Sequence, residues 1–286
     1  MPLSLSLQRR FGYGGKKHPW RRGVFRFLSG TVARRAGGGI TFADDDEVLA
    51  RVRADLGLPP GPRVDHYVDE LRAERPLIEA FELAGTRHGR VEDASWDARL
   101  VRCRGVVALY YGLLRELRPA VVVETGTAAG SLTSFVMAAL ARNAHGRLIS
   151  IDIPPVAGKL QMNLSVAAES VGFFIPPAYR ERWTYLEGDA KRLLPRVLAE
   201  ERVDVFIHDS LHTVTHMLFE YAVARALLRE GGLILSDDIL WNDAFASFLH
   251  ANRLYGYAPF SQPGTGVVVN RFDSFEKQSG IGLADA

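Results

Sequence analysis

The chain has 286 residues, a net charge of +2 and a mean hydropathy near zero, and 47% of its residues are apolar. A chain of this size can bury a full core and hold one large domain with an appendage. No apolar run is long enough to span a bilayer. The single cysteine, Cys103, excludes an internal disulfide framework and is typical of a reducing compartment, so we expect a cytoplasmic protein.

The charge is unevenly distributed along the chain. Residues 1–42 carry nine Lys or Arg and no acid, whereas all 33 acids lie in the remainder. We interpret this glycine-rich basic arm as a flexible tail or as a segment that packs on a neighbouring subunit. A contact with nucleic acid or an anionic surface, and an organelle transit peptide, are the alternatives.

Residues 43–118 are predicted to form a helical N-terminal extension, with breaks at Pro59-Pro60 and at Pro76. A core domain follows over residues 119–272, and residues 273–286 are predicted to be a tail. The segment 153–182 contains two Pro-Pro pairs and is longer than a minimal crossover, which is typical of a substrate lid.

Short apolar runs recur from residue 120 onward, and each of them ends in an acidic residue. The acids at the ends of these runs are Glu124, Asp152, Asp189, Asp209 and the pair Asp237-Asp238. Buried apolar runs separated by helical segments read as parallel strands of an α/β sheet. Their carboxyl ends would meet at one edge, where open α/β sheets bind ligands.

A glycine turn follows the first of these strands. Gly126 and Gly130 allow a tight turn, Ser131 is a candidate helix cap, and free amides there suit a carboxylate or phosphate. The spacing differs from the dinucleotide fingerprint, which disfavours a nicotinamide-linked oxidoreductase. Asp152, about 20 residues past the turn, is placed to bind ribose hydroxyls, and Asp189 is suited to an adenine edge.

Three acids at the ends of neighbouring strands indicate a cation site. Asp209, Asp237 and Asp238 would repel one another unless a cation lies among them. Hard oxygen ligands favour Mg²⁺, Ca²⁺ or Mn²⁺ over zinc. Carboxylates that hold no metal are the alternative interpretation.

The segments ETGTAAGS, ISID, LEGDA, FIHDSLH and GGLILSDDI together resemble those of class I S-adenosylmethionine-dependent methyltransferases. More narrowly, they resemble the metal-dependent macrocin- and mycinamicin-type sugar O-methyltransferases. The resemblance covers roughly residues 101–271. It implies a Rossmann-like, mostly parallel sheet with an antiparallel C-terminal strand and helices on both faces.

The resemblance also implies roles for individual residues. The methionine end of the cofactor would be held by Glu124, Thr125, Gly126, Gly130 and Ser131. The ribose would be bound by Asp152 and the adenine would lie beside Asp189. The metal ligands would be Asp209, Asp237 and Asp238. His212 would be the general base, with Asp209 assisting; capping of the following helix is the alternative role for His212.

We therefore expect an O-methyltransferase that transfers the methyl group of S-adenosylmethionine to a hydroxyl of a sugar or other small-molecule natural product. We expect it to need Mg²⁺ or another hard divalent cation, and to form a homo-oligomer. The alternative acceptors are a polysaccharide or glycolipid hydroxyl, a catechol-like phenol and an RNA ribose. A further alternative is a module that binds the cofactor without catalysing a reaction.

Enzymes that methylate exocyclic amines commonly carry Asp/Asn-Pro-Pro after the fourth strand. This chain has Asp209-Ser-Leu-His212 there, which argues against a nucleic-acid base as the acceptor.

Overall fold

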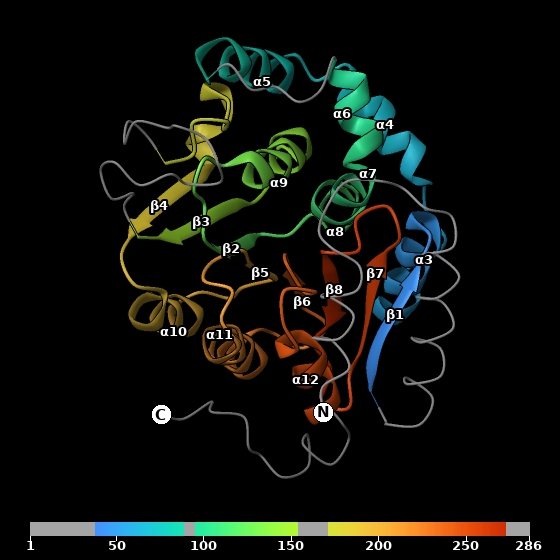
Figure 1. Cartoon of the computed structure of the whole chain (residues 1–286), viewed down its shortest axis with the longest axis vertical. Helices are drawn as coiled ribbons and strands as arrows, with labels where there is room; N and C mark the ends of the chain where they lie inside the picture. Colours follow the sequence, from blue (N-terminus) through green and yellow to red (C-terminus); the bar gives the residue numbers. More distant parts are fainter. Residues whose placement is uncertain (1–37, 89–94, 154–170, 273–286) are drawn as a thin grey trace.

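The computed structural model describes residues 38–88, 95–153 and 171–272. Most of the basic arm, the middle of the predicted lid and the predicted tail lie outside the described residues. The described part is an α/β structure in which a single sheet separates two layers of helices (Figure 1).

The sheet has eight strands in the order β1-β7-β8-β6-β5-β2-β3-β4. The strands are β1 (Gly39–Ala43), β2 (Val121–Thr125), β3 (Arg147–Asp152), β4 (Trp183–Glu187), β5 (Val205–His208), β6 (Leu233–Ser236), β7 (Tyr255–Pro259) and β8 (Gly266–Val269). All neighbours are parallel except β8, which runs antiparallel to both β6 and β7. The predicted mostly parallel sheet with an antiparallel C-terminal strand is therefore confirmed.

Helices cover both faces of the sheet (Figure 1). On one face, side chains of α9 (Ser131–Asn143), the π-helical turn η1 (Val107–Gly112) and the early helices share a core with alternate residues of the central strands. On the other face, α10 (Ala190–Glu200), α11 (Val214–Leu227) and α12 (Ala244–Ala251) pack on the remaining strand residues. Because both faces are covered, β2, β5, β6 and β8 are buried along their whole length, which explains their continuous apolar runs.

The segment between residues 45 and 117 is mainly helical, and a strand that the sequence did not indicate precedes it. The helices of this segment are α3 (Asp45–Leu56), α4 (Val64–Arg72), α5 (Arg75–His88), α6 (Trp96–Arg102), α7 (Arg104–Val106) and α8 (Leu113–Leu117). A short 3-10 helix, η2 (Pro177–Arg182), lies outside this segment, immediately before β4. Residues 39–42, which we had assigned to the arm, belong instead to β1, which adds a parallel edge strand beside β7. None of the described helices is long and apolar enough to cross a membrane.

A buried ion pair fastens the extension together. Arg53 on α3 donates from Nε and Nη2 to the two carboxylate oxygens of Glu116 on α8, at 2.7 and 2.5 Å, and from Nη2 to the Pro62 carbonyl at 2.5 Å. The Arg53 side chain is only 6% exposed. A charge in this position is stable only while its partners remain.

We expect Arg53→Ala to lower the free energy of unfolding by about 3 kcal/mol, because it removes the cationic partner of the Glu116 carboxylate in a partly buried place and leaves it with the Tyr67 hydroxyl as donor. Arg51→Ala is the matched control, since Arg51 pairs with Glu47 on the exposed side of the same helix, and should change stability by less than about 0.5 kcal/mol. Urea denaturation followed by circular dichroism measures both. Equal losses in the two variants would show that the Arg53–Glu116 pair does not hold the extension.

Candidate active site at the carboxyl edge of the sheet

The ends of β2, β5 and β6 lie side by side and in register. Thr125 is opposite His208, and His208 is opposite Ser236. The backbone ladder continues one residue further, because the Asp209 amide donates to the Thr125 carbonyl and the Asp237 amide to the His208 carbonyl, both at 2.9 Å. The predicted meeting of these strand ends at one edge is thus confirmed.

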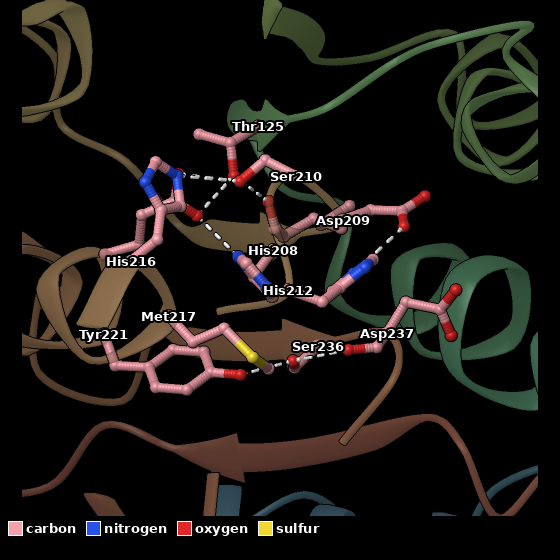
Figure 2. Close-up of polar contacts among 12 residues, drawn as sticks. Thr125, His208, Asp209, Ser210, His212, His216, Met217, Tyr221, Ser236 and Asp237 are labelled. Atoms are coloured by element: carbon pink, nitrogen blue, oxygen red, sulfur yellow. Dashed lines mark hydrogen bonds and ion pairs between the residues drawn. The ribbon is translucent and has the colours of Figure 1, made fainter. Parts of the chain in front are cut away.

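The pleat divides the residues at this edge between the two faces of the sheet. The α9 and η1 face is defined by the core residues Val122, Ile207 and Leu235, and alternation continues it to Glu124, Asp209 and Asp237. The α11 face is defined by Val123, Phe206 and Ile234, and alternation continues it to Thr125, His208 and Ser236. Figure 2 shows the outcome, since Asp209 and Asp237 point to the same side, away from His216 and Tyr221 on α11.

The acids on the first face raise one another's proton affinity. Burial raises the pKa of Asp209 well above its ordinary value, and the charges of Asp237 and Glu124 add to this. Burial, followed by the charge of Asp238, raises the pKa of Asp237 to about 7. These carboxyl groups therefore lie close enough to repel one another when ionised.

His212 lies between two of these acids. Its Nδ1 is 3.4 Å from Oδ2 of Asp238, and its Nε2 is 3.8 Å from Oδ1 of Asp209. Burial lowers the pKa of His212, although the charge of Asp238 opposes the shift, so the imidazole is neutral near pH 7. The cap of α11 is Thr213, which removes the capping alternative for His212.

Three buried polar atoms at this edge have no hydrogen-bond partner among the described residues: His212 Nε2, Tyr110 Oη and, on the α11 side of the sheet, His208 Nε2. Tyr110 lies on η1 and is fully buried. Burial raises the pKa of its phenol well above the ordinary value, and the charges of Asp237 and Asp209 contribute to the shift. Buried polar atoms normally have partners. In the sequence Tyr110 occupies an apolar position at helical spacing, and that pattern favours core packing over a polar contact.

The glycine turn is packed too tightly for any side chain. Gly126 has a φ of 82°, and a Cβ there would lie 2.1 Å from the Asp209 carbonyl oxygen. Asp152 fastens the turn, because its Oδ2 accepts from the amides of Thr127 and Ala128 at 2.9 and 2.7 Å. Thus the turn, Asp152 and Asp209 form one rigid unit at the carboxyl edge.

The helix after the turn begins differently from our prediction. The cap position of α9 is Gly130, with a φ of 80° and no side-chain hydrogen bond, and Ser131 is the first helical residue. The predicted cap role of Ser131 was therefore wrong. The described end of the predicted lid is fixed to this turn, since the amides of Gly172 and Phe174 donate to the carbonyls of Ala128 and Ala129.

Besides Asp152, three more of the predicted cofactor residues have protein partners. Glu124 is fully buried and accepts hydrogen bonds from Thr133 Oγ1 at 2.9 Å and Ser150 Oγ at 2.8 Å. Asp189 caps α10 by accepting from the Lys191 amide. Thr125 donates to Glu220 on the opposite face. For these residues, contact with a cofactor stays a prediction.

The three predicted metal ligands come to the same edge, but the described residues contain no group of three His, Cys, Asp or Glu already arranged as a metal site. Sequence reasoning also missed Glu220, which lies directly behind the edge and binds His208 and His216. The spacing of His216 and Glu220, four residues apart on one predicted helix, was the available signal.

We expect Gly126→Ala to destabilise the protein by about 3 kcal/mol, because the added Cβ needs an unfavourable backbone conformation and also meets the Asp209 carbonyl. Gly57→Ala is the control: Gly57 has a φ of 68° but open space around it, so only the conformational penalty of about 1 kcal/mol applies. Thermal unfolding of both variants measures the difference. Similar losses would contradict the close packing of the turn.

A second prediction concerns pH. Burial raises the pKa of Glu124 to about 7, against hydrogen bonds from Ser150 and Thr133. Between about pH 4.3 and pH 7 the unfolded chain therefore releases a proton that the folded chain keeps, so this group reduces stability progressively as pH rises. As pH rises over this interval, the melting temperature of Glu124→Gln should increase relative to that of the wild type. The difference between the two melting temperatures should become constant above about pH 7. Parallel melting curves from pH 4 to 8 would show that Glu124 ionises normally.

Comparison with known proteins agrees with this geometry. Residues 123–239 match the family model described as a methyltransferase domain. No curated protein is significantly similar to the chain.

Several solved structures resemble it distantly. Cofactor-bound Rv0187 from MTB is 18% identical with a TM-score of 0.46, over 75% of this chain and 99% of the other. An O-methyltransferase from Bacillus cereus in complex with SAH is 15% identical with a TM-score of 0.44, over 72% and 96% of the two chains. MycE methyltransferase of the mycinamycin biosynthetic pathway, in complex with Mg and SAH, is 17% identical with a TM-score of 0.34, over 60% of this chain and 39% of its own.

The family match covers β2 to β6 with the glycine turn and the acids of the carboxyl edge. Residues 123–239 are therefore similar to a methyltransferase domain, and they lie on a sheet with the strand order and the antiparallel β8 described above.

Proposed function

We propose that the protein transfers the methyl group of S-adenosylmethionine to a hydroxyl oxygen of a sugar or a similar small natural product, with the help of Mg²⁺. The observation that carries this proposal is the convergence of Asp209, Asp237, Asp238 and His212 beside the glycine turn. An acceptor hydroxyl has to lose a proton during the transfer, and this arrangement offers both negative charge for a cation and a neutral base.

The cofactor would lie across the glycine turn. The start of α9 offers free amides to its carboxylate. The Asp152 carboxylate sits at the end of β3, in the position that suits ribose hydroxyls in sheets of this type. Because Asp152 also holds the amides of Thr127 and Ala128, binding of the ribose and the shape of the turn are coupled.

The donor set suits a hard divalent cation in its chemistry. Asp209, Asp237 and Asp238 are oxygen ligands, and the raised pKa values of Asp209 and Asp237 reflect burial and mutual repulsion that a cation would relieve. The charges of these two acids also raise the pKa of Tyr110, whose Oη has no hydrogen-bond partner among the described residues. A bound cation would supply Lewis acidity that lowers the pKa of the acceptor hydroxyl and fixes its position.

His212 is the proposed general base. Its pKa is lowered by burial, so the imidazole is neutral and has a free lone pair near pH 7. Nε2 is the ring nitrogen without a hydrogen-bond partner among the described residues, and we assign proton uptake to this atom. Asp238, 3.4 Å from Nδ1, would stabilise the imidazolium that results.

Exposed apolar side chains next to His212 offer a surface for the acceptor. The Trp241 ring lies 6.4 Å from the His212 ring, and 58% of Trp241 is exposed. Leu211 and Val214 flank His212 in sequence and are also exposed. An indole face of this kind suits the C–H face of a sugar ring or the flat face of an aromatic ring.

The test is methyl transfer from radiolabelled S-adenosylmethionine to a panel of sugars with vicinal hydroxyls and to catechol, with Mg²⁺ or with chelator. We expect labelling that needs the metal and that falls by about 100-fold or more in Asp237→Asn, while S-adenosylhomocysteine binds with nearly the same Kd. Asp97→Asn on α6, an exposed position, is the control.

Two results would contradict the proposal. Undiminished activity in Asp237→Asn would remove the assigned role of that acid, and equal labelling with and without chelator would remove the metal. Transfer to catechol alone would retain the chemistry but change the acceptor class from sugar to phenol.

A further inference from the structure

Glu220 on α11 lies on the face of the sheet opposite the acids, and it is completely buried. Its carboxylate is the meeting point of four polar side chains from β2, β5, the loop after β5 and α11. These are Thr125 Oγ1 at 2.7 Å, His208 Nδ1 at 2.5 Å, Ser210 Oγ at 2.9 Å and His216 Nε2 at 2.8 Å.

The carboxylate remains ionised in this environment. Burial alone would raise the pKa of Glu220, but hydrogen bonds from His208 and His216 lower it to about 2. A buried carboxylate is very unfavourable unless donors surround it. The four donors therefore determine the orientation of Glu220, and Glu220 in turn determines theirs.

The partners of Glu220 are the residues that adjoin the proposed reacting groups. Thr125 is the last residue of β2 and precedes Gly126 of the glycine turn. His208 and Ser210 lie immediately on either side of Asp209. Through these neighbouring residues, Glu220 restrains the backbone of the glycine turn and of Asp209 from the α11 side of the sheet. Among the described residues, no hydrogen bond joins Glu220 to the acids on the other face.

The network also reaches His212. Because an ionised carboxylate only accepts hydrogen bonds, His208 must carry a hydrogen on Nδ1. This fixes the His208 ring edge-on to the His212 ring, with 5.4 Å between their centroids and an interplanar angle of 88°. A change at Glu220 would therefore be transmitted to the proposed base through packing.

We propose that Glu220 is a positioning residue for methyl transfer, which sets the relative placement of the glycine turn, Asp209 and His212 through its hydrogen bonds to Thr125, His208 and Ser210. It touches no reacting group itself. The proposal rests on the roles of Asp209 and His212 given under the proposed function. Positioning of this kind matters because small displacements of catalytic groups reduce rates strongly.

The first test is nuclear magnetic resonance of the histidine rings in protein without added acceptor. Wild type should show a downfield proton on His208 Nδ1, and Glu220→Gln should lose it and shift the ring signals of His212. Glu200→Gln, an exposed position in the last turn of α10, should leave both unchanged. Signals of His212 are assigned with His212→Asn. Unshifted His212 signals in Glu220→Gln would overturn the proposal.

Ser210→Ala covers the case in which Glu220→Gln does not fold. It removes one of the four hydrogen bonds to Glu220 from a partly exposed position. It should move the His212 signals in the same direction by a smaller amount, and unchanged signals would again contradict the proposal.

The second test is kinetic and uses the acceptor that the labelling panel identifies. In Glu220→Gln we expect kcat to fall at least about tenfold with the KM for S-adenosylmethionine within about twofold. A purely structural role would lower the melting temperature and leave kcat per folded molecule unchanged, which would overturn the proposal. Failure of the wild type to label any acceptor would count against the proposed acceptor class instead, and the spectroscopic test would still decide the role of Glu220.

Discussion

The alternation of side chains across the pleat at the ends of β2, β5 and β6 is the constraint on which the site depends. At three neighbouring strand ends, one residue faces α9 and η1 and the next faces α11. The residues that face α9 and η1 are acids, and the residues that face α11 form hydrogen bonds inside the protein. A shift of register by one residue would exchange the two sets and would direct Asp209 and Asp237 toward α11, where the buried carboxylate of Glu220 lies.

The protein environment has opposite effects on the carboxylates of the two faces. Glu220 is surrounded by donors, so the structure stabilises its charge. Asp209 and Asp237 are beside other acids, and the structure penalises their charge. The first arrangement is complete within the protein and makes a rigid support. The second is complete only when positive charge is added, which is what a binding site for a cation requires.

Much of this architecture follows from sequence because the central strands are buried on both faces. Val121–Val123, Val205–Ile207 and Leu233–Leu235 are continuous apolar runs, and the acid after each run marks the strand end. The antiparallel β8 was predictable because Pro263-Gly264 separates two short apolar segments. The convergence of Asp209, Asp237 and His212 follows from the same pattern.

The features that sequence did not reveal depend on partners far along the chain. β1 is five residues long, follows a glycine-rich arm, and exists through pairing with β7 more than two hundred residues later. Glu220 lies on a helix where a buried glutamate is unexpected, and its partners come from β2 and β5. The cap of α9 was mistaken because Gly130, in a left-handed conformation, takes the place that Ser131 would fill.

The most direct test of this account is calorimetric titration of S-adenosylhomocysteine into chelator-treated protein, repeated with Mg²⁺. We expect micromolar binding of the cofactor product at the glycine turn in both conditions, with heat from Mg²⁺ itself when the metal is added to the complex. Absence of cofactor binding with and without Mg²⁺ would contradict the assignment of the carboxyl edge as a methyl-transfer site.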